Sequence, residues 1–286
     1  MNTQLALNPI TDVRELLAFP FMVNALEAGT IVAVLAAVVG WYMVLRRQSF
    51  AGHTLSVMAF PGAAGAALIG IPTALGYYLA CGGAALAMRG ARGSMRRTYG
   101  AETATIATVQ TVGLAAGFLF LSLNDAVLGG TETLLFGTFL GVSRGQVLTL
   151  LIIALAALAL IAIAARPLLL ETIDPEAARA RGLPVAVLDT GFLLLLAAAV
   201  AATSQITGAL LVFALLVAPA AAAQQLTMRR GLGLALSVLF AVVVVWLGLG
   251  IAFFSIWPVG FYVTSIAFAV YLAARLTRVM LDRRRG

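Results

Sequence analysis

The chain has 286 residues, of which 62% are hydrophobic and only 10% are charged. Soluble domains carry about 25% charged residues, so this composition excludes an ordinary soluble protein and indicates a membrane protein. The formal net charge of +7 would also suit a nucleic-acid-binding protein. All 18 basic residues are arginines, however, and nearly all of them lie where apolar runs end. This pattern favours contact with membrane lipid over contact with nucleic acid.

No pattern in the chain predicts a catalytic centre. A phosphate-binding loop that hydrolyses ATP ends in Gly-Lys-Ser/Thr, and the chain contains no lysine. The patterns of zinc proteases, Cys-x-x-Cys sites and serine hydrolases are also missing from the sequence. We therefore expect the chain not to be an enzyme and to hold no permanently bound cofactor. Any ATP hydrolysis that it uses is expected to occur on a separate subunit.

Nine apolar runs follow one another along the chain, and each is a candidate membrane-spanning helix. They cover residues 21–45, 54–69, 73–88, 103–121, 147–165, 185–202, 206–223, 232–254 and 261–274. A span needs about 20 apolar residues, with a range of roughly 17–25, and the second, third and ninth runs are shorter than this. We therefore predict an all-α polytopic membrane protein with about nine transmembrane helices, in a range of about eight to ten.

The arginines predict how these helices are oriented. They cluster after alternate runs, whereas the intervening connections carry only Arg144 and the N-terminal segment only Arg14. Because basic residues near span ends stay in the cytoplasm, we expect the N-terminus outside and the C-terminus inside. The predicted organisation is an extracytoplasmic segment over residues 1–20, one membrane domain over 21–277 and a basic cytoplasmic tail over 278–286.

One predicted cytoplasmic connection contains the start and stop signals of a short helix, near residues 174–182. Asp174 can cap the first free amides of such a helix, and Pro175 suits its first position. Gly182 can adopt the left-handed conformation that ends a helix. The sequence therefore predicts a helix of about two turns between the fifth and sixth runs.

The charges in this connection also fit a helix. Glu176 complements the positive end of the helix dipole, and Arg179 and Arg181 complement the negative end. Asp189, farther along, is expected to complement the start of the next helix. A helix of two turns is not stable alone in water. We therefore expect it to be held by packing on the membrane surface or by a groove on a cytoplasmic partner.

The second apolar run opens with the densest group of small and polar residues in the chain. Pro61 removes a backbone donor and is expected to bend this helix. Gly52 and Gly62 permit close approach of neighbouring helices. His53 and Met58 place an imidazole and a thioether beside the bend. Polar groups at membrane depth face either a pathway or a neighbouring helix, and both alternatives remain open for His53.

Four stretches in the same order carry a family resemblance. Leu-Arg-Arg-x-Ser-Phe-x-Gly at 45–52 is followed by Phe-Pro-Gly at 60–62, and residues 135–143, 204–220 and 257–260 match further motifs. The chain resembles the permease subunits of zinc/manganese-type ATP-binding-cassette (ABC) importers. The resemblance implies a homodimer of permeases in a bacterial plasma membrane. It also implies two cytoplasmic ATP-binding subunits and an extracytoplasmic solute-binding protein.

The resemblance also assigns roles to single residues. Segment 174–182 would be the coupling helix that contacts the ATP-binding subunits. Gly208 and Pro219 lie in the family's most recognisable motif, where Gly208 is expected to allow a tight outer turn and Pro219 to kink the seventh helix near the pathway. Apart from the resemblance, the position of Glu27 near the outer end of the first helix makes it a candidate for attracting a cation, the alternative being an interfacial carboxylate.

The substrate is less closely defined, because the usual Gly-Asp-x-x-x-His pattern is altered. His53 stands in place of the carboxylate and Val57 in place of the imidazole. Imidazole and thioether groups favour borderline or soft ions, so zinc is expected first and manganese next. The departure leaves a second interpretation open, a permease for a metal chelate or another small nutrient. A third, a stand-alone channel or secondary carrier, would leave the capped cytoplasmic helix without a partner.

Overall fold

The structure is a computed structural model that describes residues 14–94, 101–123, 137 and 139–283. Parts of three sequence-based predictions lie outside the described residues, namely 1–13 of the outer segment, 135, 136 and 138 of one motif, and 284–286 of the tail. All secondary structure within the described residues is helical. The predicted all-α class is therefore confirmed for this part of the chain.

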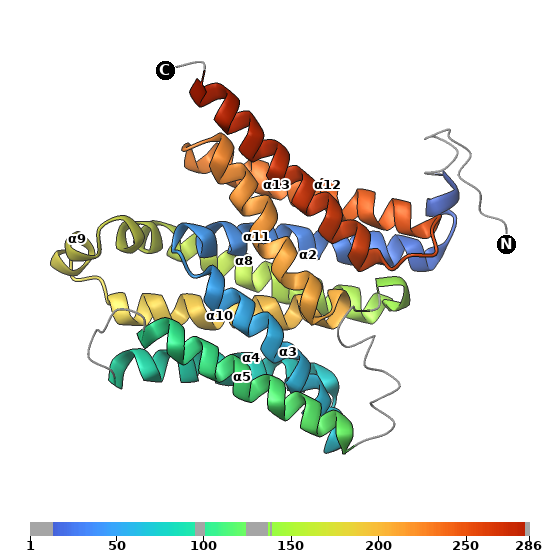
Figure 1. Ribbon diagram of the computed structural model, residues 1–286, viewed down its shortest axis with the longest axis horizontal. Coiled ribbons are helices and arrows are strands. Elements are labelled where there is room, and N and C mark those ends of the chain that lie inside the picture. Colours follow the sequence, from blue (N-terminus) through green and yellow to red (C-terminus); the bar gives the residue numbers. More distant parts are fainter. Residues whose placement is uncertain (1–13, 95–100, 124–136, 138, 284–286) are drawn as a thin grey trace.

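Nine helices of 18 residues or more make up most of the described chain, and Figure 1 shows them packed into a single bundle. They are α2 Pro20–Leu45, α3 Ser49–Leu68, α4 Thr73–Ser94, α5 Ala101–Ser122, α8 Arg144–Ile173, α10 Val185–Thr207, α11 Ala209–Leu226, α12 Arg230–Phe253 and α13 Val259–Arg283. Two short elements lie between them, the 3₁₀ turn η1 Phe139–Gly141 and the helix α9 Pro175–Ala180. Each of the nine predicted runs corresponds to one long helix.

Six of the described helices, α2, α5, α8, α10, α12 and α13, are both long and apolar enough to cross a membrane. Helix α11 has a shorter apolar stretch over Leu211–Leu226. Helices α3 and α4 have 20 and 22 residues, which is long enough to span, but small and polar residues interrupt their apolar surface. The number of nine crossings therefore stays a prediction for these three helices.

Helix α2 lies in the middle of the bundle. It contacts α8, α10, α11 and α12, and 67% of its apolar segment is buried. Figure 1 shows α3, α4 and α5 together along one side of the bundle and α12 and α13 along the opposite side. The peripheral helices α5 and α13 bury only 22% and 17% of their apolar segments. Their exposed apolar side chains are suited to face lipid.

Glycines allow the closest helix contacts in the bundle. A Cβ at Gly40 of α2 would overlap the Leu216 carbonyl oxygen of α11, so these two backbones are in direct contact. Gly62 of α3 and Gly76 of α4 face each other in the same way, since a Cβ on either would overlap the other's carbonyl oxygen. At Gly52 a Cβ would overlap a methionine sulfur of α2. Such contacts between small residues stabilise helix pairs where lipid gives no hydrophobic driving force.

The helix that follows the fifth run is longer than the sequence suggested. The run was predicted over 147–165, ending at an arginine and Pro167, but α8 continues through Pro167 to Ile173. A proline removes one hydrogen bond without always ending a helix, and here the residues beyond it, among them Glu171, are held by contacts to other helices. At 30 residues α8 is about 45 Å long, more than the roughly 30 Å of the hydrocarbon core. The helix is therefore long enough to extend beyond the core.

Candidate coupling and pathway site

Helix α9 lies at the far end of α8, beyond the end of α2 (Figure 1). The Asp174 carboxylate accepts hydrogen bonds from the backbone amides of Glu176 at 3.1 Å and Ala177 at 2.9 Å, and Pro175 occupies the first turn. At the other end the chain turns through Gly182, whose φ is +74°. Both ends of this helix are thus closed by residues within the segment that the sequence singled out.

One face of α9 is packed and the other is free. Ala178 is completely buried, and α9 contacts α8 and α10. Glu176, Arg179 and Arg181 are exposed on the outside. The segment therefore sits firmly on two long helices while it presents both signs of charge away from them. This arrangement is suited to contact another protein with complementary charges.

Replacement of Asp174 by alanine is expected to loosen α9 without disturbing the long helices. The variant loses both cap hydrogen bonds, a loss that costs about 1 kcal/mol. Hydrogen exchange should therefore become about fivefold faster at the amides of Glu176 and Ala177. Asp174→Ser is the matched control, because serine caps helices equally well and should preserve the protection. Equal protection in the alanine variant would contradict a capping role.

The two ends of the connection that carries α9 meet at a single arginine, Arg46, which ends α2. Its guanidinium donates to both carboxylate oxygens of Glu171 on the last turn of α8, at 2.6 and 3.2 Å. It also donates to Asp189 on α10 at 3.0 Å, and Gln48 donates to the same Asp189 oxygen at 3.0 Å. The centroid of the Phe192 ring lies 5.0 Å from the guanidinium carbon. We call Arg46, Glu171 and Asp189 the stem cluster.

Sequence reasoning missed the stem cluster. It interpreted Arg46 as one of the arginines that set orientation and Asp189 as a group that complements a helix start. The structure instead has Asp189 accept hydrogen bonds from side chains at the end of α2 and the start of α3. One signal was available, since Glu171 and Asp189 flank the α9 segment on either side.

His53 lies in the second turn of α3 and faces α11. Its ring packs edge to face against Phe213, with the ring centroids 4.8 Å apart. The Nδ1 atom of His53 is buried and makes no hydrogen bond within the described part of the chain. Val57, one turn farther along, is also buried. The imidazole therefore stands without a second polar ligand at the position where the family pattern has one.

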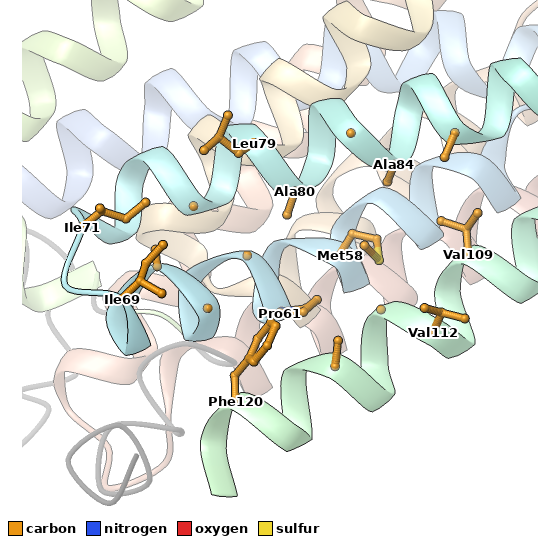
Figure 2. Close-up of a pocket in the computed structure, with 18 of the residues that line it drawn as sticks. Met58, Pro61, Ile69, Ile71, Leu79, Ala80, Ala84, Val109, Val112 and Phe120 are labelled. Atoms are coloured by element: carbon orange, nitrogen blue, oxygen red, sulfur yellow. The ribbon is translucent and has the colours of Figure 1, made fainter. Parts of the chain in front are cut away.

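The other two pathway candidates lie elsewhere. Figure 2 shows Met58 pointing into a cavity of about 670 Å³ between α3, α4 and α5, whose walls are almost entirely apolar. Glu27 is exposed and lines a different cavity, where the Trp246 indole donates to Thr30 at 2.8 Å. No group of three or more His, Cys, Asp or Glu residues suited to hold a metal forms among the described residues. The structure thus does not bring His53, Met58 and Glu27 together.

The motif around Gly208 and Pro219 forms the α10–α11 pair. Gly208 alone separates the two helices and has a φ of +76°, a conformation that favours glycine. Pro219 is buried within α11, where its missing amide cannot donate to the carbonyl of Leu215. The seventh apolar run was predicted to begin at residue 206, but that residue still belongs to α10, and α11 begins only after Gly208. Phe213, which contacts His53, lies between the glycine and the proline on the same helix.

These features define a multi-pass helical membrane protein with a capped, charged helix presented at one end of the bundle. The chain belongs to the ABC 3 transport family, which it matches over residues 18–278. The resemblance seen in the sequence is confirmed, and the chain is a multi-pass protein of the bacterial plasma membrane.

Relatives resemble the chain over most of its length. It is 32% identical to the chelated iron transport system membrane protein YfeC of Yersinia pestis over 91% of this chain and 88% of that protein. It is 31% identical to the manganese transport system membrane protein MntC of Halalkalibacterium halodurans, over 80% of this chain and 77% of that protein. Among solved structures, PsaBC from Streptococcus pneumoniae in complex with Fab superposes with a TM-score of 0.81 and 26% identity. That match covers 93% of this chain and 94% of the other.

Proposed function

We propose that this chain is the membrane-spanning permease subunit of an ABC importer for a divalent transition metal. The single observation that carries the proposal is α9, a capped helix with an exposed charged face at one end of a transport-family bundle. Such a helix suits docking to a separate ATP-binding subunit, which supplies the ATP hydrolysis that this lysine-free chain lacks. The names of the manganese and chelated-iron relatives support a metal as substrate.

The proposed assembly contains two copies of the chain, two ATP-binding subunits and a solute-binding protein. Nine crossings would place the start of α2 outside and the end of α13 in the cytoplasm. The arginine-rich connections and α9 then share the cytoplasmic side, where the ATP-binding subunits bind. ATP binding and hydrolysis would move the two permease halves as rigid bodies between outward-open and inward-open states.

Zinc is the first expected substrate and manganese the next. The argument rests on His53, because imidazole suits borderline ions such as zinc better than it suits manganese. The relatives named for manganese and chelated iron extend the set of ions that require a test. A transport pathway binds its ion weakly enough to release it, so a single imidazole is compatible with this role.

Uptake of radioactive zinc, manganese and iron tests the proposed function. The chain is expressed with its ATP-binding subunit and solute-binding protein in a strain that lacks its own metal importers. ATP-dependent accumulation of at least one of these ions is expected, together with co-purification of the ATP-binding subunit. Co-purification without accumulation of any free ion would favour a permease for another substrate. Accumulation without any ATP-binding subunit would favour a stand-alone channel or carrier.

A metal chelate is the second candidate substrate. Two observations favour it: His53 is the one imidazole in the chain, and no cluster of three ligands forms among the described residues. A carrier molecule that wraps the ion would make protein ligands unnecessary. Addition of a chelator of known metal affinity distinguishes a permease for the free ion from a permease for a chelate. The chelator should stop uptake of the free ion and should stimulate uptake of a chelate that is itself transported.

Replacing Pro219 by alanine is expected to shift the balance between the two access states about fivefold or more. The substitution supplies the backbone donor that α11 lacks at this position and is expected to remove the bend that a proline introduces. Helix α11 contacts His53 through Phe213. Accessibility of a cysteine introduced at the outer mouth, with and without ATP, measures the balance. Val217→Ala in the same helix is the control, since it shortens a side chain and leaves the backbone hydrogen bonding of α11 unchanged. An unchanged response to ATP in the Pro219 variant would contradict the hinge role.

A further inference from the structure

Three helix ends converge on the stem cluster. Arg46 is the residue that ends α2, Glu171 lies in the last turn of α8, and Asp189 lies in the second turn of α10. Helix α9 lies along the chain between Glu171 and Asp189. Both ends of the connection that carries α9 therefore bind the same guanidinium, which lies directly after α2.

The cluster is built as a rigid joint. The Arg46 and Glu171 side chains are only 5% and 9% exposed. All four terminal N–H groups of Arg46 are used, in a two-pronged contact with Glu171 and single bonds to Thr172 and Asp189. Two-pronged contacts between guanidinium and carboxylate fix orientation as well as distance. Separating the buried Arg46 and Glu171 would leave uncompensated charge, so the ends of α2 and α8 are expected to move together. The partly exposed Asp189 joins the start of α10 to them.

The joint also leads directly into α3. Arg47, the next residue, has a φ of +57°, a left-handed conformation in which arginine is unusual and glycine is favoured. The chain then reverses direction, and the backbone N–H of Gln48 donates a hydrogen bond to the backbone carbonyl of Met43 at 2.9 Å. Gln48 directly precedes α3, and its side chain donates to Asp189. His53 lies five residues beyond Gln48 on the same helix.

We propose that Arg46 is a positioning residue that transmits the movement of α9 to α3 and so to His53. The proposal rests on the function proposed above. Helices α9 and α3 make no substantial direct contact with each other, and both contact α10. The stem cluster adds a polar connection, since Arg46 and Gln48 bind Asp189 of α10 directly before α3 begins. ATP-driven displacement of α9 pulls on Glu171 and Asp189, and Arg46 with Gln48 carries that displacement into the first turn of α3.

Arg46→Lys tests the joint, because lysine keeps the charge but loses the planar fork and the stacking on Phe192. In proteoliposomes that contain the complete complex, we expect the amount of metal imported per ATP hydrolysed to fall about fivefold or more. Arg278→Lys is the matched control, since Arg278 forms an exposed pair with Asp282 at 3.0 Å, and its ratio should equal that of the wild type. An unchanged ratio of metal imported to ATP hydrolysed would overturn the proposal, even if uptake and ATP hydrolysis both fall.

Cysteine labelling at one position on α9 and one on α3 shows whether movement of α9 still reaches α3. Phe50, exposed at the start of α3, and Ala180, exposed at the end of α9, are changed singly to cysteine in a Cys81→Ser background. With Arg46 present, ATP should change the labelling rate at both positions. With Arg46→Lys, the rate at position 180 should still respond and the rate at position 50 should not. A response at both positions would show that α3 follows α9 by another route and would refute the role of Arg46.

A second variant protects the test against misfolding. Asp189 is 30% exposed and is the member of the cluster most tolerant of change, so Asp189→Asn replaces Arg46→Lys if the lysine variant fails to assemble. The asparagine keeps an acceptor oxygen but loses the charge, and the same fall in uptake per ATP is expected. If the wild-type chain neither binds an ATP-binding subunit nor imports metal, the proposed function fails. If only the ratio is insensitive, the inference about Arg46 fails alone.

Discussion

Reversing the charges of Glu176 and Arg179 together should abolish transport while the chain remains folded in the membrane. Both side chains are exposed on α9, whereas Ala178 between them holds the helix on α8 and α10. The reversed pair therefore changes the outer face of α9 and leaves its packing intact. Like charges placed opposite each other across a contact cost several kcal/mol, so substrate-stimulated ATP hydrolysis should fall by at least about tenfold.

The measurement compares stimulated ATP hydrolysis by the purified complex with the amount of chain in the membrane. Reversing Arg278 and Asp282 provides the control, because this exposed pair also has both signs of charge but lies in α13. The control should retain wild-type stimulation. Wild-type stimulation in the α9 variant as well would remove the coupling role from this helix.

Replacing His53 by alanine is expected to lower uptake by about tenfold or more if the imidazole contacts the ion. Even supporting groups of metal sites have effects of about 10–100-fold when they are mutated. His53→Asp restores the carboxylate that the family usually has here and should retain some uptake. Since carboxylate oxygen suits harder ions, its preference should shift from zinc toward manganese.

The alternative role of His53 is a contact between α3 and α11. The structure supplies a test of it, because the ring packs on Phe213 and its Nδ1 atom has no hydrogen bond within the described residues. Phe213→Leu removes the ring contact and keeps the imidazole, so it should preserve ion preference. Rescue of the alanine phenotype by His53→Phe, which keeps an aromatic ring against Phe213, without any shift between zinc and manganese, would favour the contact. Full zinc uptake by His53→Ala at normal expression would exclude His53 from the pathway.

Much of the helical framework is predictable from local patterns. Apolar runs are continuous in sequence, so each of the nine runs corresponds to a long helix. The α9 segment was equally predictable, because Asp174 and Gly182 act on backbone groups only a few residues away. The end of α8 was not, because a proline normally signals termination and the contacts that hold the turns beyond it come from α2.

The candidate site was only partly predictable for the same physical reason. The residues that form the stem cluster are far apart along the chain, since Glu171 follows Arg46 by 125 positions, so no periodicity connects them. His53 was identified from its motif, but its contact with Phe213 depends on how α3 crosses α11. Met58 was grouped with His53 because they are close in sequence. The helix turns them toward different neighbours, since Met58 packs on α5.

The backbone contact at Gly40 also determines how a growth-based mutational scan of this protein should be interpreted. Every substitution there inserts atoms into the Leu216 carbonyl, whichever ion the cell requires. Loss of growth at Gly40 would then equal the loss at a residue that touches the ion, although its cause is a shortage of correctly assembled protein. Measuring protein abundance beside growth separates the two classes. Without the measurement of protein abundance, glycines at close helix contacts would be mistaken for residues that line the transport pathway.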